Sequence, residues 1–156
     1  MGSLFNKKIL ITGGHGLLGS CVVKKLKLIN KKINLILPKS SEYNLTIESD
    51  VRRLFKTYHN IDYIIHLASS HGGLYYNIKN SGSIYYKNIL LNTHLIHYAM
   101  LAKVKKFLCA GTVDCYPKKA KTPWKEKDLW QGYPEETSSA YAFSKKMMIV
   151  QAAAYK

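Results

Sequence analysis

Tyr141 and Lys145 are the two side chains of this sequence whose types and spacing most directly suggest chemistry. Four positions apart, they share one face of any helix that contains them. An ammonium group beside a phenol lowers the pKa of the phenol because it stabilises the phenolate. Such a tyrosine can donate a proton to a carbonyl oxygen while a hydride reaches the carbonyl carbon. This spacing also occurs often by chance in solvent-exposed helix pairs, so the interpretation needs support from other residues.

Thr112 provides that support, because it follows an apolar run at 105–110 that is typical of a strand. Ligands of open α/β sheets bind at the carboxyl ends of the strands. A hydroxyl at that edge can hydrogen-bond the carbonyl group of a substrate. Thr112, Tyr141 and Lys145 together predict a reductase that acts on a ketone, with Lys145 also holding the nicotinamide ribose.

Gly13, Gly16 and Gly19 form a G-x-x-G-x-x-G pattern between an apolar run and a helical pattern. One glycine permits positive φ in a tight turn, another lets a pyrophosphate approach the backbone, and the last lets helix and strand pack closely. The helix N-terminus then presents free N–H groups to the phosphates. The pattern predicts a bound dinucleotide, the alternative being a glycine turn without a ligand. The predicted cofactor contacts in this turn include His15 and Leu18.

The end of the second apolar run bears on which dinucleotide binds. NAD binders usually carry an acidic residue there for the ribose 2′-hydroxyl. Here residues 37–41 read Leu-Pro-Lys-Ser-Ser, and Lys39 can meet a 2′-phosphate. The sequence therefore favours NADP(H), while Glu42 nearby keeps NAD(H) possible.

Four apolar runs alternate with helical patterns. Alternation of this kind predicts right-handed crossovers and a parallel sheet, hence an α/β, Rossmann-like doubly wound fold. We expect loops at 68–85 and 111–137, and Thr46 as the N-cap of the second helix. The expected strands are 7–12, 33–37, 61–67 and 105–110, and the expected helices are 17–28, 46–58, 86–102 and one from 138.

We expect one NAD(P)-binding Rossmann domain over residues 1–156. The last helical pattern contains neither Gly nor Pro after Lys146, and no other stop signal before Lys156. The sequence is therefore expected to be a fragment that is truncated before a substrate-binding part.

Composition excludes several classes of protein. With 47% hydrophobic residues the chain is of a folded, globular type. No apolar run approaches the roughly 20 residues of a membrane span, and the N-terminus lacks a secretion signal. The three cysteines have no metal-ligand spacing and fit the reduced thiols of a cytoplasmic protein. The net charge of +15 favours a solvated basic surface, with nucleic acid as the alternative, although no RNA-binding or zinc-finger pattern supports it.

Four histidines outside the glycine turn divide into three groups. His66 ends an apolar run and is expected in the core with one nitrogen satisfied. His94 and His97 have a spacing compatible with a metal, but no acidic or cysteine partner supports one, and we predict no metal site. His71 lies in the loop expected over the site and is a candidate contact for substrate or nicotinamide.

Three further stretches carry a resemblance to a known family. The segment 111–145 reads GTVDCYPKKAKTPWKEKDLWQGYPEETSSAYAFSK, residues 67–73 read LASSHGG, and Asn88 follows in the next helix. These features resemble the N-terminal half of the extended short-chain dehydrogenases/reductases, and among them the GDP-L-fucose synthases. A generic Rossmann protein would not share these loops.

The resemblance implies a reaction and its residues. NADPH would deliver hydride to the C4 ketone of a GDP-linked 6-deoxy sugar, with possible 3,5-epimerisation. Tyr141 would be the proton donor, Lys145 would tune it, and Thr112 would hold the carbonyl. The loop residue Ala68 and the glycine turn would contact the cofactor. The resemblance also implies a homodimer and no membrane partner.

Two departures from the family pattern bear on this reading. Asp114 stands where the family has a cysteine that takes part in epimerisation, and Cys115 is its neighbour. Adjacent residues of an extended segment point in opposite directions, so Cys115 is not expected to replace the missing thiol. The family also carries arginines near the cofactor phosphates at the positions of His15 and Ser40.

Three hypotheses remain open on the sequence. The first is a GDP-keto-sugar reductase, and the second is an epimerase, reductase or dehydratase of the same superfamily on another nucleotide sugar. The third is a cofactor-binding module without catalysis, whose basic surface serves another partner.

Overall fold

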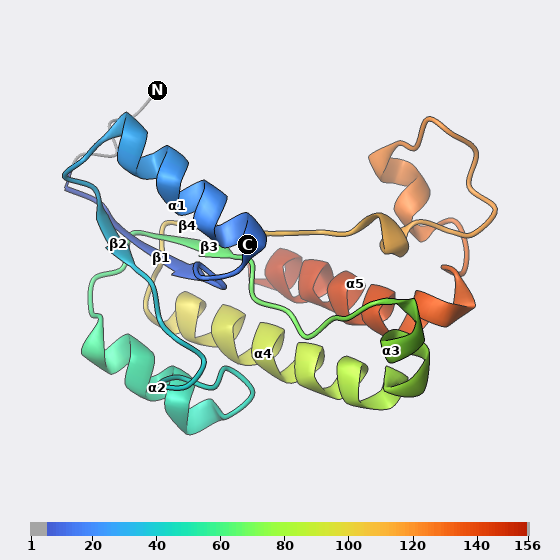
Figure 1. Cartoon of the computed structure of the whole chain (residues 1–156), viewed down its shortest axis with the longest axis horizontal. Helices are drawn as coiled ribbons and strands as arrows, with labels where there is room; N and C mark the ends of the chain where they lie inside the picture. Colours follow the sequence, from blue (N-terminus) through green and yellow to red (C-terminus); the bar gives the residue numbers. More distant parts are fainter. Residues whose placement is uncertain (1–5, 156) are drawn as a thin grey trace. The chain divides into compact units, whose positions relative to one another are not determined.

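A computed structural model describes residues 6–155. In chain order its elements are β1 (Lys8–Thr12), α1 (Leu17–Ile29), β2 (Asn34–Ile36), α2 (Glu48–Thr57), β3 (Tyr63–His66), α3 (Leu74–Lys79), α4 (Ser81–Leu101), β4 (Lys106–Cys109) and α5 (Ser139–Ala154) (Figure 1). Short 3₁₀ turns η1 (Val113–Cys115), η2 (Glu126–Trp130) and η3 (Glu136–Ser138) lie between β4 and α5.

The chain divides into two compact units. The first comprises the residues up to Ser69 together with His94–Ala110, and the second comprises Ser70–Thr93 together with the residues from Gly111 onward. That residues 1–156 form one cofactor-binding domain stays a prediction.

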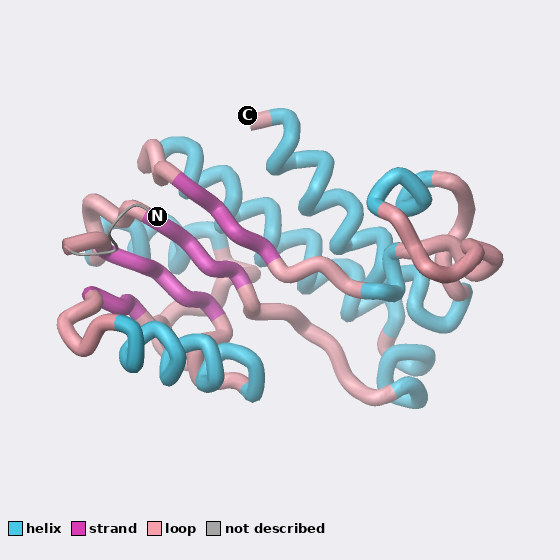
Figure 2. The backbone as a smooth tube through the Cα atoms, turned by 90° about the horizontal axis from the view of Figure 1, so that it is seen from above, coloured by secondary structure: helices cyan, strands magenta, loops and turns pink. Residues whose placement is uncertain are grey.

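The first unit contains a four-stranded sheet in the order β2-β1-β3-β4, with every neighbouring pair parallel. Figure 2 shows the four strands side by side. The register pairs Leu10 with Ile64 and Thr12 with His66, so β1 and β3 end at the same edge. The predicted α/β fold with a parallel, Rossmann-like sheet is confirmed.

The two faces of this sheet are covered by different helices, which makes it doubly wound. On one face Leu10 and Ile64 pack with Val51 and Leu54 of α2, and with Leu95 at the end of α4. On the other face the alternating strand residues Ile9, Ile11 and Ile65 pack with Val22, Val23 and Leu26 of α1. Figure 1 shows α1 and α2 on opposite sides of the sheet.

An ionic cluster closes the edge of the sheet at which the strands begin. Asp62, just before β3, accepts hydrogen bonds from Lys105 Nζ at 2.6 Å and from the backbone N–H of Lys8 at 3.0 Å. These two donors, chiefly Lys105, lower the pKa of Asp62 from its ordinary 3.8 to about 2. The cluster therefore joins the starts of β1, β3 and β4 through one carboxylate.

The N-terminus of α2 corrects one prediction. The N-cap is Ile47, not Thr46. The side chain of Asn44 accepts from both the N–H and the hydroxyl of Thr46, at 3.0 and 2.8 Å, and so forms a local turn. Because Thr46 is held in this turn, it is not available to cap the helix.

The segment predicted as a loop at 68–85 contains α3 and the first turn of α4. Ser81, Gly82 and Ser83 have low helix propensity, and this caused the error. Ile84 is only 2% exposed, and its N–H donates to the carbonyl of Asn80, so burial starts the helix where local propensity would not. The polar segment 111–137 likewise contains three 3₁₀ turns.

In the second unit, polar side chains tie α4 to neighbouring segments. Asn92 Nδ2 donates to the carbonyl of Ser144, and Gln151 Nε2 donates to the carbonyl of Thr93, so α5 lies against this part of α4. Helix α5 ends at Ala154, earlier than predicted, and Lys156 lies outside the described residues. Among residues 6–155, no helix combines the length and the hydropathy needed to span a bilayer.

Candidate active site

The glycine turn between β1 and α1 has the geometry that its sequence predicted. Gly13 has φ of +71°, which favours glycine, and its carbonyl accepts from the N–H of Gly16 at 3.0 Å. A Cβ at Gly19 would lie 2.0 Å from the carbonyl oxygen of Gly13. The turn and the helix therefore pack backbone against backbone.

The turn also packs against the segment that follows β3. A Cβ at Gly13 would lie 2.8 Å from the backbone nitrogen of Ala68. The hydroxyl of Thr12 lies 2.6 Å from Nδ1 of His66 and accepts from the N–H of Ala68 at 3.4 Å. His66 is fully buried with a satisfied nitrogen, as predicted. The structure thus brings Ala68 to the glycine turn.

The start of α1 is open to an anion. Its N-cap is Gly16, which has no side chain to cap the helix. Leu17 and Leu18, in the first turn, are 91% and 58% exposed. Backbone N–H groups at such an end have no intrahelical acceptor, so they suit a phosphate.

Basic and polar groups surround the turn on the side of β2. His15 Nε2 lies 3.2 Å from the carbonyl oxygen of Leu37, and Lys39 follows as an exposed side chain. A hollow of about 610 Å³ adjoins the turn. It is lined by Gly14, His15, Ser20, Val23, Lys24, Lys27, Leu28, Lys31 and Leu37.

Tyr141 and Lys145 lie together on α5 in the second unit. Lys145 Nζ is 5.8 Å from the centroid of the Tyr141 ring, and Lys145 is only 2% exposed. The predicted common face is confirmed. Burial of the lysine beside the phenol is unusual for a solvated helix pair and supports the functional interpretation.

Thr112 and Asp114 form a second pair in this unit. The hydroxyl of Thr112 donates to Oδ2 of Asp114 at 2.7 Å and accepts from the N–H of Asp114 at 3.3 Å. A hydroxyl can donate only one hydrogen bond, and in this arrangement Thr112 donates it to the carboxylate of Asp114.

Cys115 is turned away from that pair. It is 1% exposed, and its Sγ–H donates to the carbonyl of Ala142 at 3.4 Å. Burial raises the pKa of the Cys115 thiol. The segment is the 3₁₀ turn η1 and not the extended segment that the prediction assumed, so that Cys115 does not replace the missing thiol stays a prediction.

His71 and Asn77 complete the surroundings of Tyr141. The rings of His71 and Tyr141 have centroids 4.6 Å apart and are inclined by 50°. Asn77 on α3 lies 2.9 Å from Nε2 of His71 through its Nδ2. Asn77 was missed from the sequence because its segment was predicted as a loop, where an asparagine carries no signal of burial.

Asn88 on α4 holds the loop that carries His71. It is fully buried, its Oδ1 accepts from the N–H of Ser70, and its Nδ2 donates to the carbonyls of Ser70 and Ile84. Asn88, which matches an asparagine of the family pattern, therefore holds this loop against α4.

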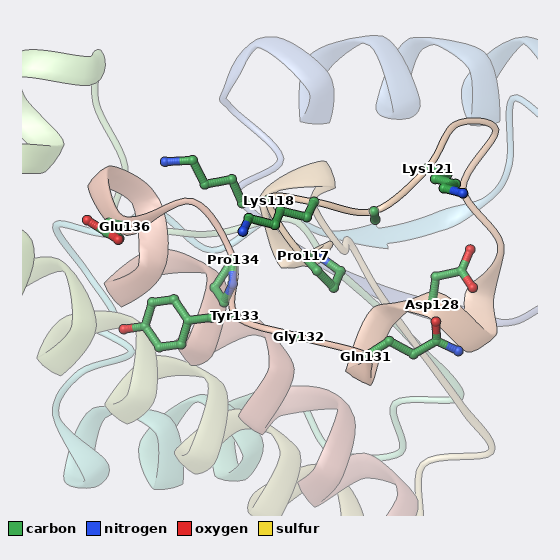
Figure 3. A pocket seen from close by; sticks show the side chains of 11 residues that line it. Pro117, Lys118, Lys121, Asp128, Gln131, Gly132, Tyr133, Pro134 and Glu136 are labelled. Atoms are coloured by element: carbon green, nitrogen blue, oxygen red, sulfur yellow. The ribbon is translucent and has the colours of Figure 1, made fainter.

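A further cavity lies in the segment between β4 and α5. Its volume is about 610 Å³, and Figure 3 shows side chains from two parts of this segment, residues 117–121 and 128–136, around it. Its lining does not include Thr112, Tyr141 or Lys145.

Among the described residues there is no group of three or more potential metal ligands. His94 Nδ1 lies 3.2 Å from the carbonyl oxygen of Leu45, and the ring of His97 packs edge-on against Tyr98.

Comparison with known proteins decides the family. Residues 9–156 match the model of the NAD dependent epimerase/dehydratase family. The chain belongs to this family. The match covers the glycine turn, Thr112 and the Tyr141–Lys145 pair alike.

Several members of the epimerase/dehydratase family are similar over nearly the whole chain. The putative GDP-L-fucose synthase 2 of Arabidopsis thaliana is 36% identical over 149 residues, which are 96% of this chain and 45% of that protein. GDP-L-fucose synthase of Escherichia coli is 31% identical, with 89% and 43% covered. The chain thus spans less than half the length of these curated relatives.

A solved structure shows the same fold. MlghC, a GDP-mannoheptose C4 reductase from Campylobacter jejuni with NADP bound, superposes with a TM-score of 0.91 at 28% identity. The superposition covers 99% of this chain and 48% of that one.

The packing of Gly19 generates a testable prediction. We expect Gly19→Ala to lower the free energy of unfolding by at least about 2 kcal/mol, because the new methyl group must displace the carbonyl of Gly13. Chemical denaturation followed by circular dichroism measures the change.

Gly82→Ala is the matched control, since a Cβ there meets nothing within 4 Å and Gly82 lies in α4. It should leave stability unchanged or raise it by up to about 1 kcal/mol. Equal stability of the two variants would contradict the packing described for the turn.

Proposed function

We propose that this chain is the cofactor-binding and catalytic part of an NADP(H)-dependent reductase that acts on the C4 ketone of a GDP-linked sugar. The observation that carries the proposal is the buried ammonium of Lys145 beside the ring of Tyr141, in a member of the epimerase/dehydratase family. The similar GDP-L-fucose synthases and the GDP-mannoheptose C4 reductase support the substrate class.

The residues of the first unit fit a dinucleotide. The close contacts of Gly13 and Gly19 leave no room for a Cβ, and the uncapped start of α1 offers N–H groups to a pyrophosphate. We assign the pyrophosphate to Gly13, Gly16 and Gly19, with Leu18 and Ala68 beside it. Bound NADPH would supply the hydride.

The second unit supplies the proton. As the ketone becomes an alcohol, the hydroxyl of Tyr141 gives its proton to the carbonyl oxygen and is left as a phenolate. The ammonium of Lys145 stabilises that negative charge, and its burial strengthens the interaction because little water screens it. Lys145 is also the residue that we assign to the nicotinamide ribose.

Asp114 changes what Thr112 can contribute. Thr112 can donate to the substrate carbonyl only after its hydroxyl proton has turned away from Asp114. Asp114, already an acceptor here, suits the removal of a proton from carbon next to the ketone better than its return. The arrangement therefore favours C4 reduction over complete 3,5-epimerisation.

Two further features belong to the proposal, an assembly and an alternative substrate. We propose that the protein works as a homodimer in the cytoplasm, where its three free cysteines would stay reduced. The second candidate is reduction of a heptose in place of a 6-deoxyhexose, which the similarity to the GDP-mannoheptose C4 reductase favours.

The cofactor assignment predicts a preference between dinucleotides. We expect the chain to bind NADPH more tightly than NADH, because Lys24 and Lys27 line the hollow beside the glycine turn, no carboxylate lines it, and the exposed Lys39 follows β2. Isothermal titration calorimetry with each dinucleotide measures both affinities. Lys39→Glu should remove the preference, while Lys87→Glu, which makes the same charge change on α4, should keep it. Equal or tighter binding of NADH to the unmodified chain would refute the assignment.

The assignment of the proton donor predicts a loss of turnover. Tyr141→Phe should lower the rate of reduction of a GDP-4-keto-6-deoxy sugar by at least about a hundredfold, the usual scale of a positioned general acid. The affinity for NADPH should hardly change, since the glycine turn is intact. Tyr75→Phe, at a tyrosine that is 78% exposed, is the control. Near-normal turnover by Tyr141→Phe in the full-length protein would exclude this proton donor, and NADPH binding without any turnover by the unmodified full-length protein would favour a non-catalytic module.

The position of Asp114 predicts weak epimerisation. During turnover in D₂O, we expect little deuterium at C3 and C5 of the product, because Asp114 stands in place of the family's thiol and its carboxylate is engaged by the hydroxyl of Thr112. Asp114→Cys should increase the incorporation, measured by mass spectrometry of the sugar. Rapid incorporation at both carbons by the unmodified protein would show that Asp114 or another residue does the work of the thiol.

A further inference from the structure

The amide of Asn77 is oriented by its neighbours on α3 and the preceding loop. Its Oδ1 lies 3.0 Å from the backbone nitrogen of Gly72, and its Nδ2 lies 2.9 Å from Nε2 of His71. A backbone N–H can only donate, so the oxygen of the amide must face Gly72. The NH₂ group then faces His71, and Asn77 is 7% exposed, so this arrangement is sheltered from water.

The orientation of Asn77 determines the protonation of His71. Because the amide NH₂ donates to Nε2, that nitrogen must carry a lone pair. The ring proton is then on Nδ1, and the imidazole is neutral. A proton on Nε2 would point at another donor, so the hydrogen bond from Asn77 selects the Nδ1-protonated tautomer.

His71 brings this neutral ring to Tyr141. The two centroids are 4.6 Å apart, while Lys145 Nζ lies 5.8 Å from the centroid of the Tyr141 ring. Histidine is a polar residue, so its contact with the Tyr141 ring is not a purely apolar one. Its charge would act on the phenolate that forms at Tyr141 in the proposed reaction. A ring held neutral packs against the phenol and leaves the ammonium of Lys145 as the cation beside it.

Gly72 makes the histidine, the loop and α3 one unit. A Cβ at Gly72 would lie 2.5 Å from Cδ1 of Tyr76, so the loop packs directly on α3. The N–H of Asn77 donates to the carbonyl of Gly73 at 3.0 Å, which places the amide within one helical turn of the loop.

We propose that Asn77 is a positioning residue, which holds His71 as the neutral, Nδ1-protonated tautomer so that its ring fixes the orientation of the Tyr141 phenol. The kinetic part of this proposal rests on the proposed role of Tyr141 as proton donor. The tautomer and its dependence on Asn77 do not, and they are measured without substrate.

The first experiment reads the tautomer of His71 by ¹⁵N-edited NMR of the imidazole groups in the unmodified chain. His71→Phe identifies the signals by their loss. We expect a protonated Nδ1 and an unprotonated Nε2. Asn77→Asp should move the proton to Nε2, since a carboxylate can accept from Gly72 with one oxygen and from Nε2 with the other. A protonated Nε2 in the unmodified chain, or no change in Asn77→Asp, would overturn the proposal.

The second experiment separates positioning from mere stability. We expect His71→Phe, which keeps a ring against Tyr141, to retain kcat within about threefold, and His71→Ala to lower kcat by about tenfold with an unchanged affinity for NADPH. Asn77→Asp should lower kcat as well. Unchanged turnover in His71→Ala would overturn the positioning role. If Tyr141→Phe kept normal turnover, the proton-donor assignment would fail instead, and the NMR result would stand by itself.

Discussion

The contact between the backbone of Gly19 and the carbonyl of Gly13 is the constraint on which the first unit depends. A Cβ at Gly19 would lie 2.0 Å from that oxygen, so the start of α1 is held directly against the end of β1. Gly13 in turn meets Ala68 beyond β3, where a Cβ would lie 2.8 Å from the backbone nitrogen. The backbones of two strand ends and a helix thus meet closely at Gly13 and Gly19, and the open start of α1 lies at this point. The same contacts that build the fold therefore leave a place for a pyrophosphate.

Buried amides have the corresponding task in the second unit. Asn88 satisfies both its oxygen and its NH₂ group through backbone partners at Ser70 and Ile84. A buried amide left without these partners would cost about 1–3 kcal/mol, so the loop has little freedom to leave the helix. Asn77 acts in the same way on the next residues of the same loop, with Gly72 and His71 as partners. Polar side chains inside this unit therefore determine where the loop beside Tyr141 lies.

The chemistry proposed for the site depends on a few specific hydrogen bonds and on the charge of Lys145. The single hydrogen bond that the hydroxyl of Thr112 can donate goes to the carboxylate of Asp114. Lys145 brings a buried positive charge to Tyr141, and Asn77 donates a hydrogen bond to Nε2 of His71. Membership of the epimerase/dehydratase family explains the tyrosine and the lysine. In the proposed reaction, Asp114, which stands where the fucose synthase pattern has a cysteine, would favour reduction over epimerisation.

The sequence by itself determined the class of fold, the glycine turn and the pairing of Tyr141 with Lys145. These depend on local rules: strand and helix periodicity, the need for glycine at positive φ, and the i, i+4 geometry of a helix. It failed at Thr46 and at α3, because the turn at Asn44 and the burial of Ile84 override local preference. Only the tertiary structure decided that Cys115 is buried, that the hydroxyl of Thr112 donates a hydrogen bond to Asp114, and that His71 lies against Tyr141. Each of these depends on which side chains from distant or turn-forming positions meet, and spacing along the chain carries no record of such meetings.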